Sequence, residues 1–280
     1  MELKGKTVFI TGNSKNCGKT TFMNYLTAKL PYRDFVRMTI GIDGEKEDAV
    51  FGHPKPKVFT KKDEIIISTV SNIESSSAQF EIIDVYPYKT CIGRIACAKT
   101  NREGYIELAG PETNKQLIEI IADMRTKGFD TFFIDGAVNR ITQVSENKDA
   151  IFYYVSIVRS AKLQSSIDDI EKIFLLSQLE EKEISSKDDI LIKGALTQNR
   201  LAEIKGKKTN IILKDITKVF LNLKDLKRLL KDQRLFVENR FSLQNIIVNL
   251  FDVNKDIFLK NLKEKKIKDI IIFNPYKEEF

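Results

Sequence analysis

The chain has 280 residues, a formal net charge of +7 and 42% hydrophobic residues, which suits one large α/β domain or two smaller ones. It has no run of about eighteen apolar residues and no signal peptide before its first apolar stretch, so we expect a cytoplasmic protein without a membrane span. Its three cysteines and one histidine make no disulfide framework and no four-ligand zinc site. The lysines are spread along the chain without a basic block, so nucleic acid is not an expected partner.

The segment Gly12–Thr21, with glycines at positions 12 and 18, follows the first apolar run, Val8–Ile10, and leads into a stretch with helical periodicity that begins at Lys19. We call it the glycine-rich loop. At a strand-to-helix turn several backbone N–H groups surround one anion, and the helix N-terminus adds about half a positive charge. Lys19 is therefore expected to reach the terminal phosphates of ATP and to act in catalysis, and the Thr20 hydroxyl is expected to bind Mg²⁺. The residues predicted to hold the nucleotide are Gly12, Asn13, Ser14, Lys15, Asn16, Cys17, Gly18, Lys19, Thr20 and Thr21.

The spacing of this loop departs from the usual pattern, in which a glycine stands five positions before the glycine of Gly-Lys-Thr. That position is Asn13, and Gly12 lies one residue earlier. The longer spacing resembles dethiobiotin synthetase and the signal-recognition/MinD class of P-loop proteins more than kinases or Ras-like GTPases. Asparagine tolerates the left-handed backbone that such a turn needs. The alternative, a surface turn with a chance Gly-Lys-Thr, does not account for the flanking strand and helix.

Two further motifs place carboxylates after predicted strands. Phe35–Ile40 precedes Asp43 and Glu45, and open α/β sheets bind ligands outside the carboxyl ends of their strands. Both acids are predicted to serve magnesium, and Asp43 is also a candidate catalytic residue; the alternative is a turn with solvated acids. Thr131–Ile134 is continuously apolar, as in a strand buried on both faces, and ends in Asp135. Asp135 is therefore predicted to support magnesium rather than only to cap a turn.

The expected fold is α/β, a mostly parallel sheet of the P-loop NTPase kind with an antiparallel β insertion and a C-terminal α/β region. Residues 1–155 form the predicted nucleotide-binding domain, with the insertion near 53–108 and a hairpin turn at Asn101–Gly104. Residues 156–280 form the C-terminal region, either separate or continuous with the first. Predicted helices cover 19–30, 113–128, 166–179, 198–204, 223–230 and 256–262, and the later strands cover 149–155, 190–192, 211–213 and 270–273.

Four segments follow one another along roughly the first 155 residues: the glycine-rich loop, Ile40–Glu45 with Lys55 and Pro56, Glu107–Pro111, and Ile134–Arg140. In this order they resemble the family of KamB, a subunit of the lysine 5,6-aminomutase reactivase. The C-terminal portion is similar only in general texture. Where Cys17 stands, the family loop has alanine, so a thiol here is expected to make activity redox-sensitive.

The resemblance implies an ATP-dependent, chaperone-like factor that works with a second ATPase subunit related to MutS. Together they would exchange damaged cobalamin for intact adenosylcobalamin in the adenosylcobalamin-dependent aminomutase. It implies that Lys19 and Thr20 bind phosphate and magnesium, that Asp135 supports magnesium, and that the segments at Asp43 and 135–140 sense nucleotide. Self-association into a homodimer stays open.

Two other classes of function stay open at this point. One is an ATP-dependent small-molecule ligase or kinase of the dethiobiotin synthetase type, which shares the loop spacing. The other is a nucleotide-binding scaffold without turnover. The chain lacks the Asn-Lys-x-Asp pattern that reads guanine, which favours ATP over GTP.

Overall fold

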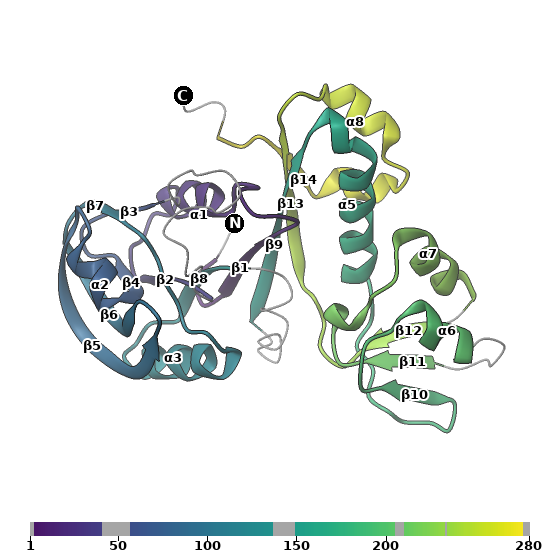
Figure 1. Ribbon diagram of the computed structural model, residues 1–280, viewed down its shortest axis with the longest axis horizontal. Helices are drawn as coiled ribbons and strands as arrows, with labels where there is room; N and C mark the ends of the chain where they lie inside the picture. Colours follow the sequence, from purple (N-terminus) through teal and green to yellow (C-terminus); the bar gives the residue numbers. More distant parts are fainter. Residues whose placement is uncertain (1–2, 41–56, 137–148, 205–209, 233, 277–280) are drawn as a thin grey trace.

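The computed structural model describes residues 3–40, 57–136, 149–204, 210–232 and 234–276. Nine strands form the central sheet: β1 (Thr7–Gly12), β2 (Phe35–Thr39), β4 (Ile65–Thr69), β5 (Gln79–Thr90), β6 (Gly93–Arg102), β8 (Thr131–Asp135), β9 (Ala150–Val158), β13 (Leu243–Leu250) and β14 (Ile271–Phe273). Their order is β14-β13-β9-β1-β8-β2-β4-β6-β5 (Figure 1). Neighbouring strands are parallel from β14 to β4, and β6 and β5 extend the sheet in antiparallel fashion. The predicted α/β fold with a mostly parallel sheet is confirmed.

The C-terminal half of the chain leaves this sheet and returns to it. A small parallel sheet, β10 (Asp189–Ile192), β11 (Asn210–Leu213) and β12 (Arg234–Val237), lies with its helices at the lower right of Figure 1. The chain then rejoins the central sheet through β13 and β14. The remaining elements are α1 (Lys19–Ala28), β3 (Val58–Thr60), α2 (Val70–Glu74), β7 (Gly104–Ile106), α3 (Asn114–Thr126), α5 (Leu163–Ser177), α6 (Gln198–Ile204), α7 (Leu223–Asp232), α8 (Lys255–Asn261) and the 3₁₀ turns η2 (Ser160–Lys162), η3 (Ile216–Lys218) and η4 (Lys265–Asp269).

Apolar clusters cover both faces of the sheet, because its central strands carry apolar side chains on both sides. Val8 and Ile10 of β1 are fully buried in the cluster on the side of α1, together with Phe22 of that helix. Phe9 is fully buried in the opposite cluster, to which α3 and α5 contribute. The sheet therefore has helices on both faces, with α1 on one face and α3 and α5 on the other.

A capping box, which the spacing of Thr113 and Gln116 in the sequence predicts, begins α3. Thr113 Oγ1 accepts a hydrogen bond from Gln116 N at 3.3 Å, and Gln116 Oε1 accepts one from Thr113 N at 3.3 Å. Each side chain satisfies an amide that the first turn of a helix leaves without a partner.

The hairpin turn predicted at Asn101–Gly104 is wrong. β6 runs through Arg102 and pairs with β4 and β5, whereas β7 pairs with β3. Gly104 serves a different purpose, because a Cβ atom there would lie 2.5 Å from the backbone nitrogen of Ala78. The glycine permits a close approach of two backbones, which a sequence pattern does not distinguish from a turn.

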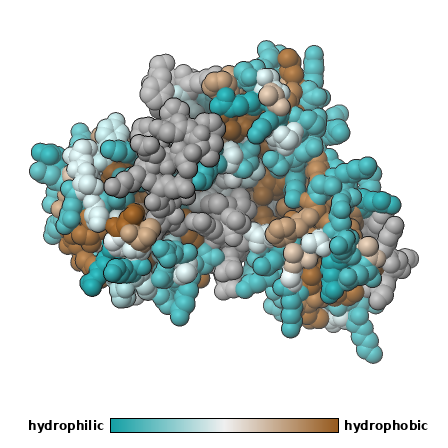
Figure 2. Space-filling model, viewed as in Figure 1, coloured by the Kyte–Doolittle hydropathy of each residue, from teal (hydrophilic) through white to brown (hydrophobic). Residues whose placement is uncertain are grey.

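The outer surface of the described residues is mostly hydrophilic on the face shown in Figure 2. Hydrophobic side chains on the outer strand β5 are an exception, with Ile82, Ile83 and Val85 more than two-fifths exposed. Within the described ranges, no helix has the length and apolar character needed to cross a bilayer.

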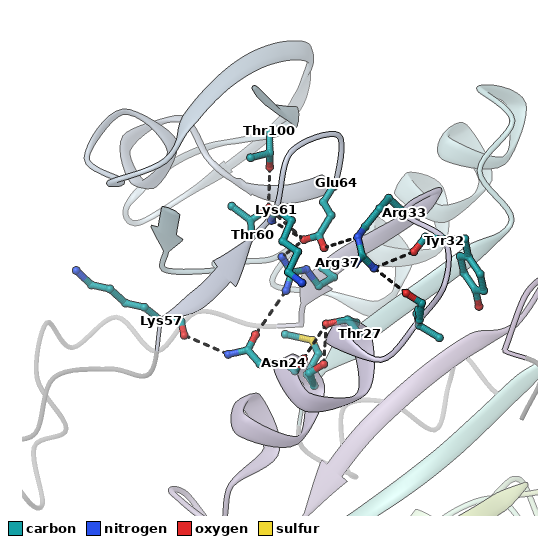
Figure 3. A network of polar contacts seen from close by, with 12 residues as sticks. Asn24, Thr27, Tyr32, Arg33, Arg37, Lys57, Thr60, Lys61, Glu64 and Thr100 are labelled. Carbon is teal, nitrogen blue, oxygen red and sulfur yellow. Dashed lines mark hydrogen bonds and ion pairs between the residues drawn. The ribbon is translucent and has the colours of Figure 1, made fainter. Parts of the chain in front are cut away.

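A buried ion pair connects β2 to the start of β4 and contacts α1 through Asn24 (Figure 3). Arg37 of β2 and Glu64 are 1% and 3% exposed, and Arg37 Nη2 donates to Glu64 Oε2 at 2.5 Å. Arg37 Nη1 lies 3.5 Å from Asn24 Oδ1 on α1, and Glu64 Oε2 also accepts from Lys61 N at 3.1 Å and from Thr60 Oγ1 at 3.3 Å. Burial lowers the pKa of Arg37 to about 10. Arg37 therefore stays charged at neutral pH, and its contacts link α1, β2 and the start of β4.

We predict that Glu64→Gln destabilises the protein by about 3 kcal/mol or more, because it leaves the buried Arg37 cation without its counter-charge. Chemical denaturation measures the change in the free energy of unfolding. Asp63→Asn is the matched control, since it breaks only the exposed Lys99–Asp63 pair at 2.9 Å and should cost less than about 1 kcal/mol. Equal effects of the two variants would show that the buried pair does not support the fold.

Candidate phosphate and magnesium site

The glycine-rich loop lies at the carboxyl edge of the central sheet. Ile10 of β1 pairs with Asp135 of β8 on one side and with Tyr153 of β9 on the other. The connection after β1 leads through α1 toward β2, whereas the connection after β9 leads through α5 toward β13. The border between β1 and β9 is therefore a topological switch point, where open α/β sheets bind their ligands.

The backbone of the loop turns sharply before α1. Asn16 and Gly18 have left-handed conformations, with φ of 57° and 101°. Gly18 is the N-cap of α1, and a glycine has no side chain with which to cap that helix end. The first amides of α1 therefore face the loop, where a helix N-terminus favours an anion.

Gly12 has no space for a side chain. A Cβ atom there would lie 2.4 Å from Cys17 Sγ and 2.7 Å from the carbonyl oxygen of Val155. Cys17 is 1% exposed and belongs to the apolar cluster on the α1 side. The thiol is thus part of the packing under the loop, with Lys19 Nζ 3.8 Å from its sulfur.

Lys19 bends back over the loop from the first turn of α1. Its Nζ donates to the carbonyl oxygen of Ser14 at 3.1 Å. The ammonium group therefore lies against the backbone of the loop, where it adds its positive charge to the partial positive charge of the helix N-terminus.

Thr20 and Asp135 meet at the same edge. Thr20 Oγ1 donates to Asp135 Oδ2 at 2.6 Å. The carbonyl oxygen of Asp135 accepts from Thr39 Oγ1 at 2.9 Å and from Ile40 N at 3.0 Å, which ties the end of β8 to the end of β2. A hydroxyl and a carboxylate at this separation are oxygen groups of the kind that Mg²⁺ takes, directly or through water.

The predicted magnesium residues Asp43 and Glu45, and the segments 41–56 and 137–140, lie outside the described residues. Within the described ranges no three His, Cys, Asp or Glu side chains gather closely enough to form a metal cluster. Thr20 and Asp135 could hold Mg²⁺ only if water and phosphate oxygens completed its octahedron, which is the usual arrangement for this ion.

The Glu107–Pro111 segment passes over the end of β2. A Cβ atom on Gly110 would lie 1.6 Å from the carbonyl oxygen of Thr39, and the carbonyl oxygen of Glu107 accepts from Ser68 Oγ at 2.9 Å. The described parts of the four sequence segments therefore come together at one edge of the sheet.

Two residues that the sequence patterns did not single out lie against the loop from the C-terminal strands. Asn249 of β13 donates from Nδ2 to the carbonyl oxygen of Cys17 at 2.8 Å. A Cβ atom on Gly18 would lie 2.8 Å from Asn249 Nδ2 and 3.0 Å from Tyr276 Oη. Burial raises the pKa of Tyr276 to about 12. In the sequence, the pattern that could have pointed to Asn249 is the apolar run before it, which resembles the run before Asp135.

No protein-family model matches this chain, and neither a curated protein nor a solved structure matches it.

We predict that Gly12→Ala destabilises the protein by about 1–3 kcal/mol and displaces the loop, because the added methyl group overlaps a backbone oxygen and a buried sulfur. Denaturant unfolding measures the loss. Gly194→Ala is the control, since a Cβ atom there has nothing within 4 Å, and its effect should stay within about 0.5 kcal/mol. A Gly12→Ala protein as stable as the control would contradict the packing described here.

Proposed function

We propose that the chain is a P-loop protein that binds and hydrolyses ATP with Mg²⁺. The observation that carries the proposal is the hydrogen bond between Thr20 and Asp135 beside the N-terminus of α1. It places a hydroxyl, a carboxylate and the Lys19 ammonium around one strand-to-helix turn. Phosphate needs the cation and the helix amides, and magnesium needs the oxygen groups.

In this proposal each residue has a defined task. The loop amides and Lys19 bind the phosphate oxygens, and Lys19 neutralises charge that develops on them during transfer. Thr20 is a magnesium ligand, and Asp135 orients the coordination shell. When bound, Mg²⁺ supplies charge stabilisation to the β- and γ-phosphate oxygens.

We propose further that this ATPase is a subunit of a chaperone-like factor that reactivates lysine 5,6-aminomutase by exchanging its adenosylcobalamin. The support is the four segments that resemble the KamB family. Ile40, Gly110 and Asp135 come from three of them, and these residues lie beside one another next to the loop. A common location is expected if the four segments serve one nucleotide-dependent mechanism. The expected partners are the second, MutS-related ATPase subunit and the aminomutase.

Lys19→Ala should weaken the binding of magnesium-ATP by tenfold or more, because each charge-assisted contact to phosphate is worth about 1.5–3 kcal/mol. Titration calorimetry measures the dissociation constant. Lys115→Ala, at an 86% exposed side chain on α3, is the control and should bind as the wild type does. Unchanged affinity in a folded Lys19→Ala protein would refute the phosphate site.

Asp135→Asn should leave ATP binding largely intact and depress hydrolysis, because the neutral amide organises magnesium poorly. Phosphate release measures the rate, and Asp149→Asn, at the opposite end of the sheet, is the control. In the reactivase, Asp135→Asn should also fail to restore a cobalamin-inactivated aminomutase mixed with the partner ATPase, ATP and fresh adenosylcobalamin.

The same assay separates the proposed function from a ligase or kinase. The wild-type chain with its partner should give ATP-dependent recovery of the aminomutase. If it gives none, and the chain alone converts a small metabolite with ATP, the reactivase proposal is wrong.

A further inference from the structure

The ends of β9 and β13 extend beyond the glycine-rich loop. Gly12, at the end of β1, pairs with Val155, but β9 continues to Val158, which pairs with Leu250 of β13. The ladder goes one step further, since Phe251 N donates to the carbonyl oxygen of Val158 at 3.1 Å. At about 3.3 Å per residue, Arg159 lies about 13 Å beyond Val155 along the strand direction. These two strands form a shelf beside the loop.

Arg159 and Phe251 lie on the same face of this shelf as the loop. Alternate residues of a strand share a face, and Val155 and Ile157 of β9 pack in the cluster on the α1 side. Arg159 keeps an extended backbone, with φ of −117° and ψ of 148°, so it continues that row. On β13 the corresponding row is Ile247, Asn249 and Phe251, of which Ile247 is buried in the same cluster.

The Phe251 ring is held in place but open to solvent. It is 67% exposed, and the guanidinium carbon of Arg159 lies 4.1 Å from its centroid. The two strand ends are clamped together, because Ser160 donates from N and Oγ to the two carboxylate oxygens of Asp252, each at 2.7 Å. A rigid, exposed ring beside a cation is a surface on which a planar heterocycle stacks.

Asn249 connects this surface to the loop. It stands two residues before Phe251 and donates to the carbonyl oxygen of Cys17. Its Oδ1 is buried and has no hydrogen-bond partner in the described part of the chain. Strand β13 thus fixes the position of Phe251 relative to the loop, and Asn249 Oδ1, a hydrogen-bond acceptor, lies between them along this strand.

We propose that Phe251 and Arg159 form the stacking surface for the base of the nucleotide whose phosphates lie on the glycine-rich loop. The proposal rests on the proposed function, because it takes the phosphate position as given. The surface lies outside the carboxyl ends of β9, which borders the switch point at β1, and of its neighbour β13. A base can extend on this side while its phosphates stay at α1. The ligand class is a purine nucleoside triphosphate.

The test compares two ligands that share three phosphates, magnesium-ATP and magnesium-tripolyphosphate, by titration calorimetry. Phe251→Ala should weaken ATP binding about tenfold and leave tripolyphosphate binding unchanged, because only ATP has a base to stack. Phe251→Tyr should retain the affinity for ATP. Phe220→Ala is the matched control, since Phe220 is 66% exposed and lies next to the small sheet, where it donates its backbone N–H to Leu196.

The outcomes separate the two proposals. If the wild type binds neither ligand, the phosphate site itself is wrong, and the base surface fails with it. If the wild type binds both, and Phe251→Ala changes ATP and tripolyphosphate binding equally or changes neither, the phosphate site stands and the base surface is wrong. Selective loss of ATP binding in Phe251→Ala, with Phe220→Ala unaffected, supports the base surface.

Discussion

The hydrogen bond from Thr20 to Asp135 connects the first turn of α1 to the end of β8, and the candidate site depends on it. Two residues so far apart in sequence meet because β1 and β8 are adjacent, parallel and in a register that sets Ile10 beside Asp135. Parallel neighbours bring their carboxyl ends to the same edge of a sheet, so the loop after one strand and the acid at the end of the other come together. Any shift in that register would separate the hydroxyl from the carboxylate.

Contacts at two levels hold α1 and its loop in this position. Below the helix, the buried Arg37–Glu64 pair and Asn24 tie it to β2 and to the start of β4. A buried ion pair costs much of its attraction in desolvation, so its contribution is one of defined geometry as much as stability. At the helix N-terminus, Asn249 holds the carbonyl oxygen of Cys17 on the outside of the loop. Contacts to the body of α1 and to the loop before it therefore fix the position of both before any ligand binds.

The C-terminal half of the chain contributes to the site because it rejoins the central sheet. After the small sheet β10-β11-β12, the chain returns as β13, beside β9 and two strands from β1. This return places Asn249 against the loop and Phe251 beyond it. Tyr276, which follows β14, packs edge-on against Tyr25 of α1, with ring centroids 6.2 Å apart. Asn249 and Tyr276, both from the C-terminal half, therefore lie against the turn that begins α1.

The sequence alone determined the features that depend on local chemistry. The glycine-rich loop, the apolar strand that ends in Asp135 and the capping box of α3 were predictable, because conformational preference and spacing act over a few residues. The sequence patterns did not predict β12 or β13, since a short apolar run does not reveal whether it pairs in a sheet or with which strand. They also indicated a turn at Gly104, where a neighbouring backbone requires the glycine instead. Only the tertiary structure decided the strand order, the Thr20–Asp135 contact and the places of Asn249, Tyr276 and Phe251, because these depend on pairing between segments that are distant in the chain.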